Sequence, residues 1–267
     1  MNELDQIMQQ QDIILSGRRI HFWTGGAGPH LFLLHAAWGD AEMGWSNVWN
    51  ELARSFTVIA PDLPGYGRSS RMPRPSLPAM AQLIKLLLDE LKVERAVVAG
   101  NSFSAGVAIQ FADAYPAATS HLVLVNGGAM PPIPGPLRAL ISLPLVKQAF
   151  RALIRRMSYS RRTLNSSFVD QSKLPPGFFD KILEKAPFYS RIGFDAIMNT
   201  REPQHPPTVP TLLLWGAKDR LVQMKHAHLL KDWIPGAELI TLEQSGHMPQ
   251  WEQPREFVAA LCKFSQA

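Results

Sequence analysis

The sequence predicts an α/β fold built on a mostly parallel, doubly wound sheet, and two observations support this prediction. Short apolar segments rich in Val, Ile and Leu alternate with amphipathic helical patterns along the chain. Each segment is apolar almost throughout, as expected for strands covered on both faces of a parallel sheet. The predicted core strands are residues 30–35, 56–62, 96–100, 121–126, 211–216 and 237–242.

The remaining elements are predicted from the same patterns. Residues 12–16 and 18–23 flank Gly17 and predict an antiparallel hairpin at the edge of the sheet. Residues 77–91 carry apolar side chains three and four positions apart, which predicts a helix. The same spacing predicts helices over residues 105–115 and 254–264.

The strand–helix alternation stops once, between residues 130 and 210. This stretch begins and ends in proline-rich connectors, and prolines do not sit inside helices or central strands. Between them we expect an amphipathic helix with Val146, Phe150, Leu153, Ile154 and Met157 on one face, then helices around residues 178–185 and 191–199. We therefore divide the chain into a core, residues 1–129 and 211–267, and a helical insertion, residues 130–210.

Composition excludes several classes of protein. The chain has 267 residues, 46% of them hydrophobic, and no apolar run long enough to span a bilayer. The first residues lack the basic and apolar regions of a secretory signal, and Cys262 is the single cysteine, so we expect a cytoplasmic protein. No metal-ligand spacing, phosphate loop or dinucleotide motif is present, so we expect no cofactor.

The net charge of +5 includes a basic cluster within the insertion. No nucleic-acid-binding motif accompanies it, so we expect no nucleic-acid partner. A solvated helix face is the simplest interpretation; attraction of an anionic substrate, or contact with a membrane surface or another protein, are the alternatives. The cluster consists of Lys147, Arg151, Arg155, Arg156, Arg161 and Arg162.

The segment Val97-Val98-Ala99-Gly100-Asn101-Ser102-Phe103-Ser104-Ala105-Gly106 contains the strongest chemical signal. A predicted strand runs into Gly100, and a helix rich in small residues follows Ser102. This is the strand–turn–helix setting of a nucleophilic serine, whose hydroxyl stands over the carboxyl edge of the sheet. Ser104 offers an alternative frame, but it would lie inside the helix, so Ser102 is the predicted nucleophile.

A serine hydroxyl needs a base, and the base needs an orienting group. His247 follows the last predicted strand between Gly246 and Pro249, and Asp219 follows the preceding strand. Both therefore lie at the edge of the sheet where Ser102 lies. We predict His247 as general base and Asp219 as its orienting acid.

The loop after the first core strand, His35-Ala36-Ala37-Trp38-Gly39-Asp40, supplies the remaining part. Beside a serine nucleophile of this kind, an oxyanion is bound by one N–H from this loop and one from the residue after the serine. We therefore predict the backbone N–H groups of Ala37 and Phe103 as the oxyanion hole. His35 is expected to orient the loop, and Asp62 to stabilise a Gly/Pro-rich turn.

Together these segments resemble the α/β-hydrolase superfamily, in the serine-nucleophile branch with a helical cap. The resemblance rests on residues 35–40, 61–70, 97–106, 212–222 and 245–254. It implies a cap between the sixth and seventh core strands that roofs the active site and selects the substrate. Serine at position 102 argues against the epoxide hydrolase and haloalkane dehalogenase branches, which use aspartate there.

Two residues depart from the family pattern. Ala36 stands where members usually have glycine, and a side chain there would strain the loop if the backbone needed a positive φ. Ser104 replaces the second glycine of the usual Gly-x-Ser-x-Gly motif. Both could lower activity.

The leading functional hypothesis is hydrolysis of a carboxylic ester or lactone. The segments Gly100-Asn101-Ser102 and Gln250-Trp251-Glu252 also resemble hydrolases that cleave a C–C bond in ring-cleavage dienone acids. Acyl transfer or thioester cleavage in a biosynthetic pathway, and a ligand-binding module with poor turnover, are two more hypotheses. We expect a small acyl or ester-like substrate in a pocket lined by Trp38, Phe150, Met157, Phe188, Met198 and Trp251.

Overall fold

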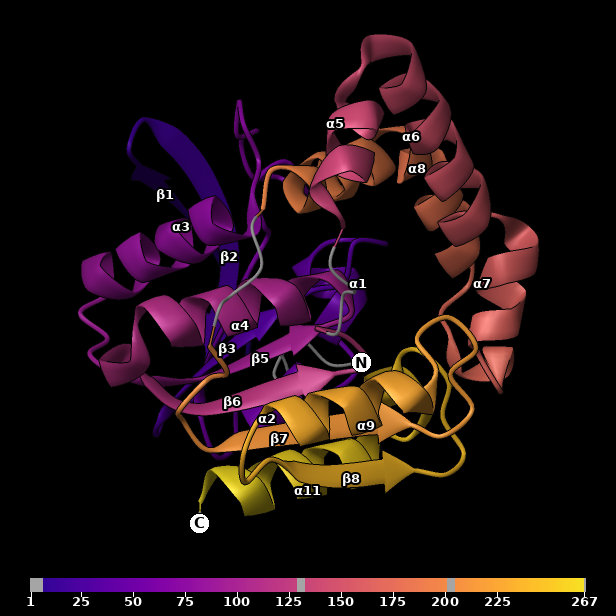
Figure 1. The fold of residues 1–267 in the computed structure, drawn as a ribbon. Helices are drawn as coiled ribbons and strands as arrows, with labels where there is room; N and C mark the ends of the chain where they lie inside the picture. Colours follow the sequence, from indigo (N-terminus) through magenta and orange to yellow (C-terminus); the bar gives the residue numbers. More distant parts are fainter. Residues whose placement is uncertain (1–6, 129–132, 201–204, 267) are drawn as a thin grey trace.

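The structure, a computed structural model, describes residues 7–128, 133–200 and 205–266. Eight strands of these residues form one sheet in the order β1-β2-β4-β3-β5-β6-β7-β8 (Figure 1). β2 pairs antiparallel with β1 and β4, and every other pair is parallel. The predicted α/β fold is therefore confirmed. The strands are β1 (Gln9–Leu15), β2 (Arg18–Gly25), β3 (His30–Leu34), β4 (Thr57–Pro61), β5 (Ala96–Asn101), β6 (Thr119–Val125), β7 (Thr211–Gly216) and β8 (Glu238–Leu242).

Helices cover both faces of the sheet. Strand side chains alternate between two apolar cores: Phe32 and Leu34 of β3 join one, and Leu31 and Leu33 join the other. The first core includes α3 (Leu77–Glu90), α4 (Phe103–Ala114) and α9 (Met224–Trp233). The second includes α1 (Ala41–Trp45), α2 (Trp49–Leu52) and α11 (Pro254–Ser265).

Two sequence expectations need correction here. β8 is only partly buried, because it lies at the edge of the sheet and lacks a neighbour on one side. The short helices α1, α2 and α10 (Pro249–Glu252) are absent from the sequence prediction, because short helices carry too few turns for a periodic pattern. The longer helix α9 is absent from it as well.

The insertion between β6 and β7 is helical in the described residues. It contains α5 (Gly135–Ser142), α6 (Pro144–Ser158), α7 (Arg161–Ser167) and α8 (Phe178–Met198). Figure 1 shows these helices beyond the arrowheads of the central strands, arched over the carboxyl edge of the sheet. The predicted boundary at 129/130 and parts of both proline-rich connectors, 130–132 and 202–204, lie outside the described residues.

The two helices predicted around 178–185 and 191–199 are one helix, α8, with Pro187 inside it. A proline removes one backbone hydrogen bond and usually ends or kinks a helix. Both halves of α8 bury apolar side chains, among them Phe178 and Ile182 before the proline and Phe194 and Ala196 after it. This burial on both sides explains why the helix continues through Pro187.

Candidate active site

Ser102 stands at the junction of β5 and α4 in a strained backbone conformation. Its φ of 57° and ψ of −112° are unusual for a residue with a side chain. Its N–H donates to the carbonyl of Val125 at 2.8 Å. A Cβ on Gly100 would lie 2.4 Å from the carbonyl oxygen of Ser104, and one on Gly127 would lie 2.1 Å from that of Ser102. The sharp turn therefore requires glycine at both positions.

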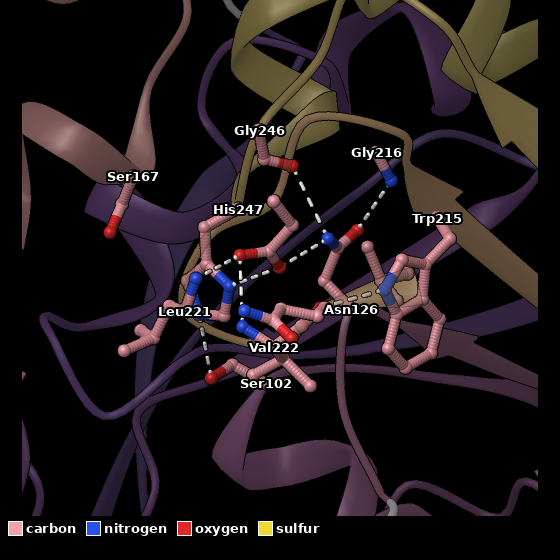
Figure 2. Close-up of polar contacts among 12 residues, drawn as sticks. Ser102, Asn126, Ser167, Trp215, Gly216, Leu221, Val222, Gly246 and His247 are labelled. Carbon is pink, nitrogen blue, oxygen red and sulfur yellow. Dashed lines mark hydrogen bonds and ion pairs between the residues drawn. The ribbon is translucent and has the colours of Figure 1, made fainter. Parts of the chain in front are cut away.

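The three residues predicted for proton transfer meet at this turn, and Figure 2 shows Ser102 and His247 among them. The Oγ atom of Ser102 lies 2.9 Å from Nε2 of His247. The Nδ1 atom of His247 lies 2.7 Å from Oδ2 of Asp219. Both His247 and Asp219 are buried. Ser102, His247 and Asp219 follow strands β5, β8 and β7 respectively, whose carboxyl ends lie at one edge of the sheet.

The environment of Asp219 keeps its carboxyl group ionised. Oδ1 accepts the N–H groups of Leu221 at 2.7 Å and Val222 at 2.9 Å. Burial raises the pKa of Asp219, but His247 and the hydrogen bonds to the carboxylate outweigh burial and hold it below its ordinary value. An ionised Asp219 accepts the Nδ1–H of His247, which leaves Nε2 free to accept the Ser102 proton.

Asn126, immediately after β6, completes this environment and is absent from the residues predicted for the site. Its amide nitrogen donates to Oδ2 of Asp219 at 2.5 Å and to the carbonyl of Gly246 at 3.2 Å. Its Oδ1 accepts the N–H of Gly216 at 3.0 Å (Figure 2). Asn126 thus joins the loops that carry Asp219 and His247. The one sequence signal for it is a polar residue at the end of the apolar segment 121–126.

The predicted oxyanion donors lie beside Ser102. Ala37, Ser102 and Phe103 line the same cavity. Phe103 is the first residue of α4, so its N–H has no acceptor within the helix. The N–H of Ala37 has no acceptor among the described residues. Both N–H groups are therefore available to an oxyanion at this edge of the sheet.

The end of α6 holds the loop that contains Ala37. The hydroxyl of Tyr159 donates to the Ala37 carbonyl at 2.8 Å, and Nε1 of Trp38 donates to the Ser158 carbonyl at 3.0 Å. The Trp38 ring also meets the His247 ring edge-on, with centroids 4.9 Å apart. Tyr159 is a second residue that the sequence does not predict, since no local pattern shows that it reaches Ala37.

His35 and Asp62 support the same loop. Nδ1 of His35 donates to the Ala36 carbonyl at 2.8 Å, and Nε2 accepts the N–H of Leu63 at 2.9 Å. Burial lowers the pKa of His35, which favours this neutral form. Asp62 accepts the N–H groups of Ala41 and Arg68 at 2.9 and 2.8 Å. Neither side chain lines the cavity around Ser102.

The two departures from the family pattern fit without strain. Ala36 is not among the described residues with positive φ, so its Cβ is tolerated. Ser104 lies inside α4 and is fully buried. Its Oγ donates to the Leu34 carbonyl at 2.6 Å and accepts the Asn101 N–H at 3.0 Å. Ser104 thus joins the turn to the end of β3 and does not line the cavity.

A cavity of about 510 Å³ opens above Ser102 between the sheet edge and the insertion. Trp38, Phe150 and Met198 line it, as do Leu137, Ile141, Ile154, Phe194 and Ile197. The described lining residues include no Lys, Arg or His, so none of the basic cluster reaches the cavity wall.

Three residues expected in the pocket lie elsewhere. Met157 is 59% exposed on α6. The ring of Phe188 packs under the guanidinium of Arg71, 3.8 Å from the ring centroid. Trp251 is buried and donates its Nε1–H to the Met43 carbonyl at 2.9 Å. Sequence periodicity separates apolar faces from polar ones, but it does not separate a cavity wall from packed or exposed apolar surface.

Comparison with known proteins places the chain in a family. Residues 31–261 match the model of the "Alpha/beta hydrolase family". An uncharacterized protein of Mycobacterium tuberculosis is 30% identical over 93% of this chain and 78% of its own. A 2-hydroxymuconate semialdehyde hydrolase of Pseudomonas sp. strain CF600 is 29% identical over 95% of this chain and 93% of its own.

A solved structure shares the fold at lower sequence identity. A putative lipase from Acinetobacter baumannii AYE superposes with a TM-score of 0.79 at 22% identity, over 98% of this chain and 94% of its own. The family match covers strands β3 to β8 and the insertion between β6 and β7, and it begins after β1 and β2. The chain therefore belongs to the alpha/beta hydrolase family.

Proposed function

We propose that this protein is a serine hydrolase that cleaves a carboxylic ester or lactone through an acyl-enzyme on Ser102. One observation supports this most directly: the hydrogen-bonded chain from Ser102 through His247 to Asp219 opens onto an apolar cavity. In this proposal, residues 130–210 form the cap that roofs the cavity, and residues 1–129 and 211–267 form the core.

Each of these groups has one role in the proposed reaction. His247 takes the Ser102 proton as Oγ attacks the carbonyl carbon, and the N–H groups of Ala37 and Phe103 hold the oxyanion. His247 then gives this proton to the departing alkoxide, which leaves the acyl group on Ser102. Water attacks the acyl-enzyme in the same way, and His247 returns a proton to Oγ. Asp219 stabilises the imidazolium in both halves of the reaction.

The cavity favours an uncharged acyl group. Its volume falls in the range of small-molecule sites, and its described walls are mainly aliphatic and aromatic. A carboxylate on the substrate would lose its hydration there without a cation to replace it. We therefore infer esters of apolar acids as the substrate class.

C–C bond hydrolysis is the second candidate, because a relative similar over nearly its whole length is named a 2-hydroxymuconate semialdehyde hydrolase. Asn101 and Gln250, one residue from each of the two segments that resemble such hydrolases, serve the fold in this chain. Nε2 of Gln250 donates to Oδ1 of Asn101 at 3.2 Å, and both residues are fully buried. Neither lines the cavity, and a dienone acid would bring a carboxylate into it.

Acyl transfer and thioester cleavage would share the acylation of Ser102 with ester hydrolysis. Acyl transfer would deliver the acyl group to an acceptor in place of water, and thioester cleavage would release a thiol in place of an alcohol. A binding module with poor turnover has less support, because Ala36 and Ser104 both fit the structure without strain.

A fluorophosphonate probe followed by substrate comparison tests the proposal. The wild-type protein should be labelled, and Ser102→Ala should not. Nitrophenyl esters of short apolar acids should then be hydrolysed faster than a dienone acid. Absence of labelling in folded protein would support the binding module. Labelling with faster cleavage of the dienone acid would support C–C hydrolysis, and labelling with neither activity would support acyl transfer.

A further inference from the structure

The surface of the insertion carries an unusual concentration of exposed apolar side chains. Helix α6 buries none of its 15 residues. Of the twelve large apolar side chains that are exposed in the described residues, seven fall between positions 137 and 157. We call these seven the α5–α6 apolar face: Leu137, Leu140, Leu143, Leu145, Leu153, Ile154 and Met157.

The α6 part of this face forms a stripe along the helix. Leu145, Leu153 and Met157 are separated by multiples of four residues and so lie along one side of α6. They are 81%, 49% and 59% exposed. The side of α6 that meets α8 is different, because Lys147 and Arg151 form ion pairs there with Asp195. The apolar stripe therefore has no partner within the described chain.

Unpaired cations accompany the stripe. The sequence has no Asp or Glu between Asp113 and Asp170. Arg155, Arg156 and Arg162 are exposed and have no acidic partner among the described residues. An exposed helix with an apolar stripe and an excess of arginine is the pattern of a segment that lies in the interface of an anionic membrane.

The apolar face is also continuous with the cavity. Leu137 and Ile154 belong to the exposed apolar face and line the cavity above Ser102. An apolar molecule held at this face could therefore reach the cavity along the apolar side chains of Leu137 and Ile154.

We propose that the α5–α6 apolar face docks onto an anionic lipid surface. Charge complementarity selects this partner: α5 and α6 carry no Asp or Glu, so a second copy joined through this face would offer Arg155, Arg156 and Arg162 no acidic partner from these helices. An anionic headgroup layer pairs with these cations, while the leucines enter the acyl boundary. The docking itself does not depend on the proposed chemistry at Ser102.

The test is sedimentation of the protein with vesicles. Wild-type protein should bind vesicles of equimolar phosphatidylcholine and phosphatidylglycerol far more strongly than pure phosphatidylcholine, and added salt should weaken binding. The double variant Leu145→Glu/Leu153→Glu should bind at least about tenfold more weakly, since two leucines no longer enter the membrane. The double variant Arg155→Ala/Arg156→Ala should bind the anionic vesicles more weakly than wild type does, and its binding to pure phosphatidylcholine vesicles should be unchanged.

Leu229→Glu is the matched control. Leu229 lies on α9 and is 60% exposed, so the same change occurs on another surface and should leave vesicle binding intact. Fluorophosphonate labelling of Ser102 and thermal unfolding should be equal in all variants, which separates a docking defect from misfolding and from failure of the proposed function.

Three results would overturn the proposal. Wild-type protein could fail to bind the anionic vesicles. The Leu145/Leu153 variant could bind them as well as wild type does. Sedimentation without lipid could reveal a wild-type dimer that this variant abolishes while vesicle binding stays unchanged, in which case the face joins two copies of the chain.

Discussion

The hydroxyl of Tyr159 donates a 2.8 Å hydrogen bond to the carbonyl oxygen of Ala37, the residue whose N–H we propose as an oxyanion donor. Burial raises the pKa of Tyr159, so its hydroxyl stays protonated and remains a donor. This bond fixes the carbonyl of the peptide that comes after the proposed N–H donor. The insertion therefore holds the loop that contains Ala37 and also contributes to the cavity wall.

Tyr159→Phe should lower kcat about fivefold and leave KM nearly unchanged. The variant removes one hydrogen bond, worth about 1 kcal/mol, that holds the loop in the geometry needed for the oxyanion. Steady-state kinetics on a nitrophenyl ester measures both constants. Tyr115→Phe is the matched control, because the ring of Tyr115 packs against Phe111 and its hydroxyl does not reach this loop. Equal kcat values for the two variants would contradict a positioning role for Tyr159.

Asn126→Asp should reduce kcat/KM by about a hundredfold or more. The change keeps the size of the side chain but places a second carboxyl group against Oδ2 of Asp219. Repulsion between the two carboxylates raises the pKa of one of them. The hydrogen bond that the imidazole of His247 donates to Asp219 is weakened as a result. Asn165→Asp is the control, because Asn165 is exposed on α7 and the variant makes the same change in charge there. Its kcat/KM should equal that of wild type. Near-wild-type activity of Asn126→Asp would remove Asn126 from the proposed site.

Ser104→Ala should destabilise the fold by about 1–3 kcal/mol and still react with the probe. The variant leaves the buried N–H of Asn101 and carbonyl of Leu34 without their hydroxyl partner. Denaturant unfolding measures the loss, and fluorophosphonate labelling reports the nucleophile. Loss of labelling in well-folded Ser104→Ala, together with retained labelling in Ser102→Ala, would assign the nucleophile to position 104.

Asp195→Asn should loosen α6 from α8. Arg151 and Lys147 of α6 both pair with Asp195, with 26% and 31% of their side chains exposed, so solvent screening limits the effect to about 1 kcal/mol. Hydrogen exchange of the backbone amides of residues 144–158 measures this loss of protection in α6. Asp180→Asn is the control, because Asp180 and its partner Arg161 are both largely exposed. Equal protection of α6 in the two variants would contradict the prediction.

The same contact predicts a pH dependence of α6 protection. Burial raises the pKa of Asp195, but the bonds from Arg151 and Lys147 prevail and hold it below its ordinary value of 3.8. A carboxyl group with a lowered pKa stabilises the fold above its unfolded pKa, and this contribution is lost as pH falls through the folded pKa. Protection of α6, corrected for intrinsic exchange, should therefore fall below pH 3.8 more steeply in wild type than in Asp195→Asn.

Several parts of this protein can be predicted from local sequence. Ser102, Asp219 and His247 each follow an apolar segment, and parallel strands present their carboxyl ends at one edge. The insertion is visible because the strand pattern stops between residues 130 and 210. Pro187 makes the prediction of α8 wrong, because burial on both sides of the proline overrides a local rule for helix ends.

The pocket and the supporting contacts cannot be predicted in this way. Phe150 lines the cavity while Met157, on the same predicted apolar face of α6, is exposed. Helical periodicity gives the direction in which a side chain points from the helix axis. It does not say whether a cavity, a packed neighbour or solvent lies in that direction.

The sequence by itself determined the α/β fold, the family and the three residues proposed for proton transfer, because strand patterns and the residues that follow them are local properties. The tertiary structure alone decided that Asn126 supports Asp219, that Tyr159 holds Ala37, and that one side of α6 stays uncovered. The first two contacts join residues more than ninety positions apart, which meet only when the chain packs.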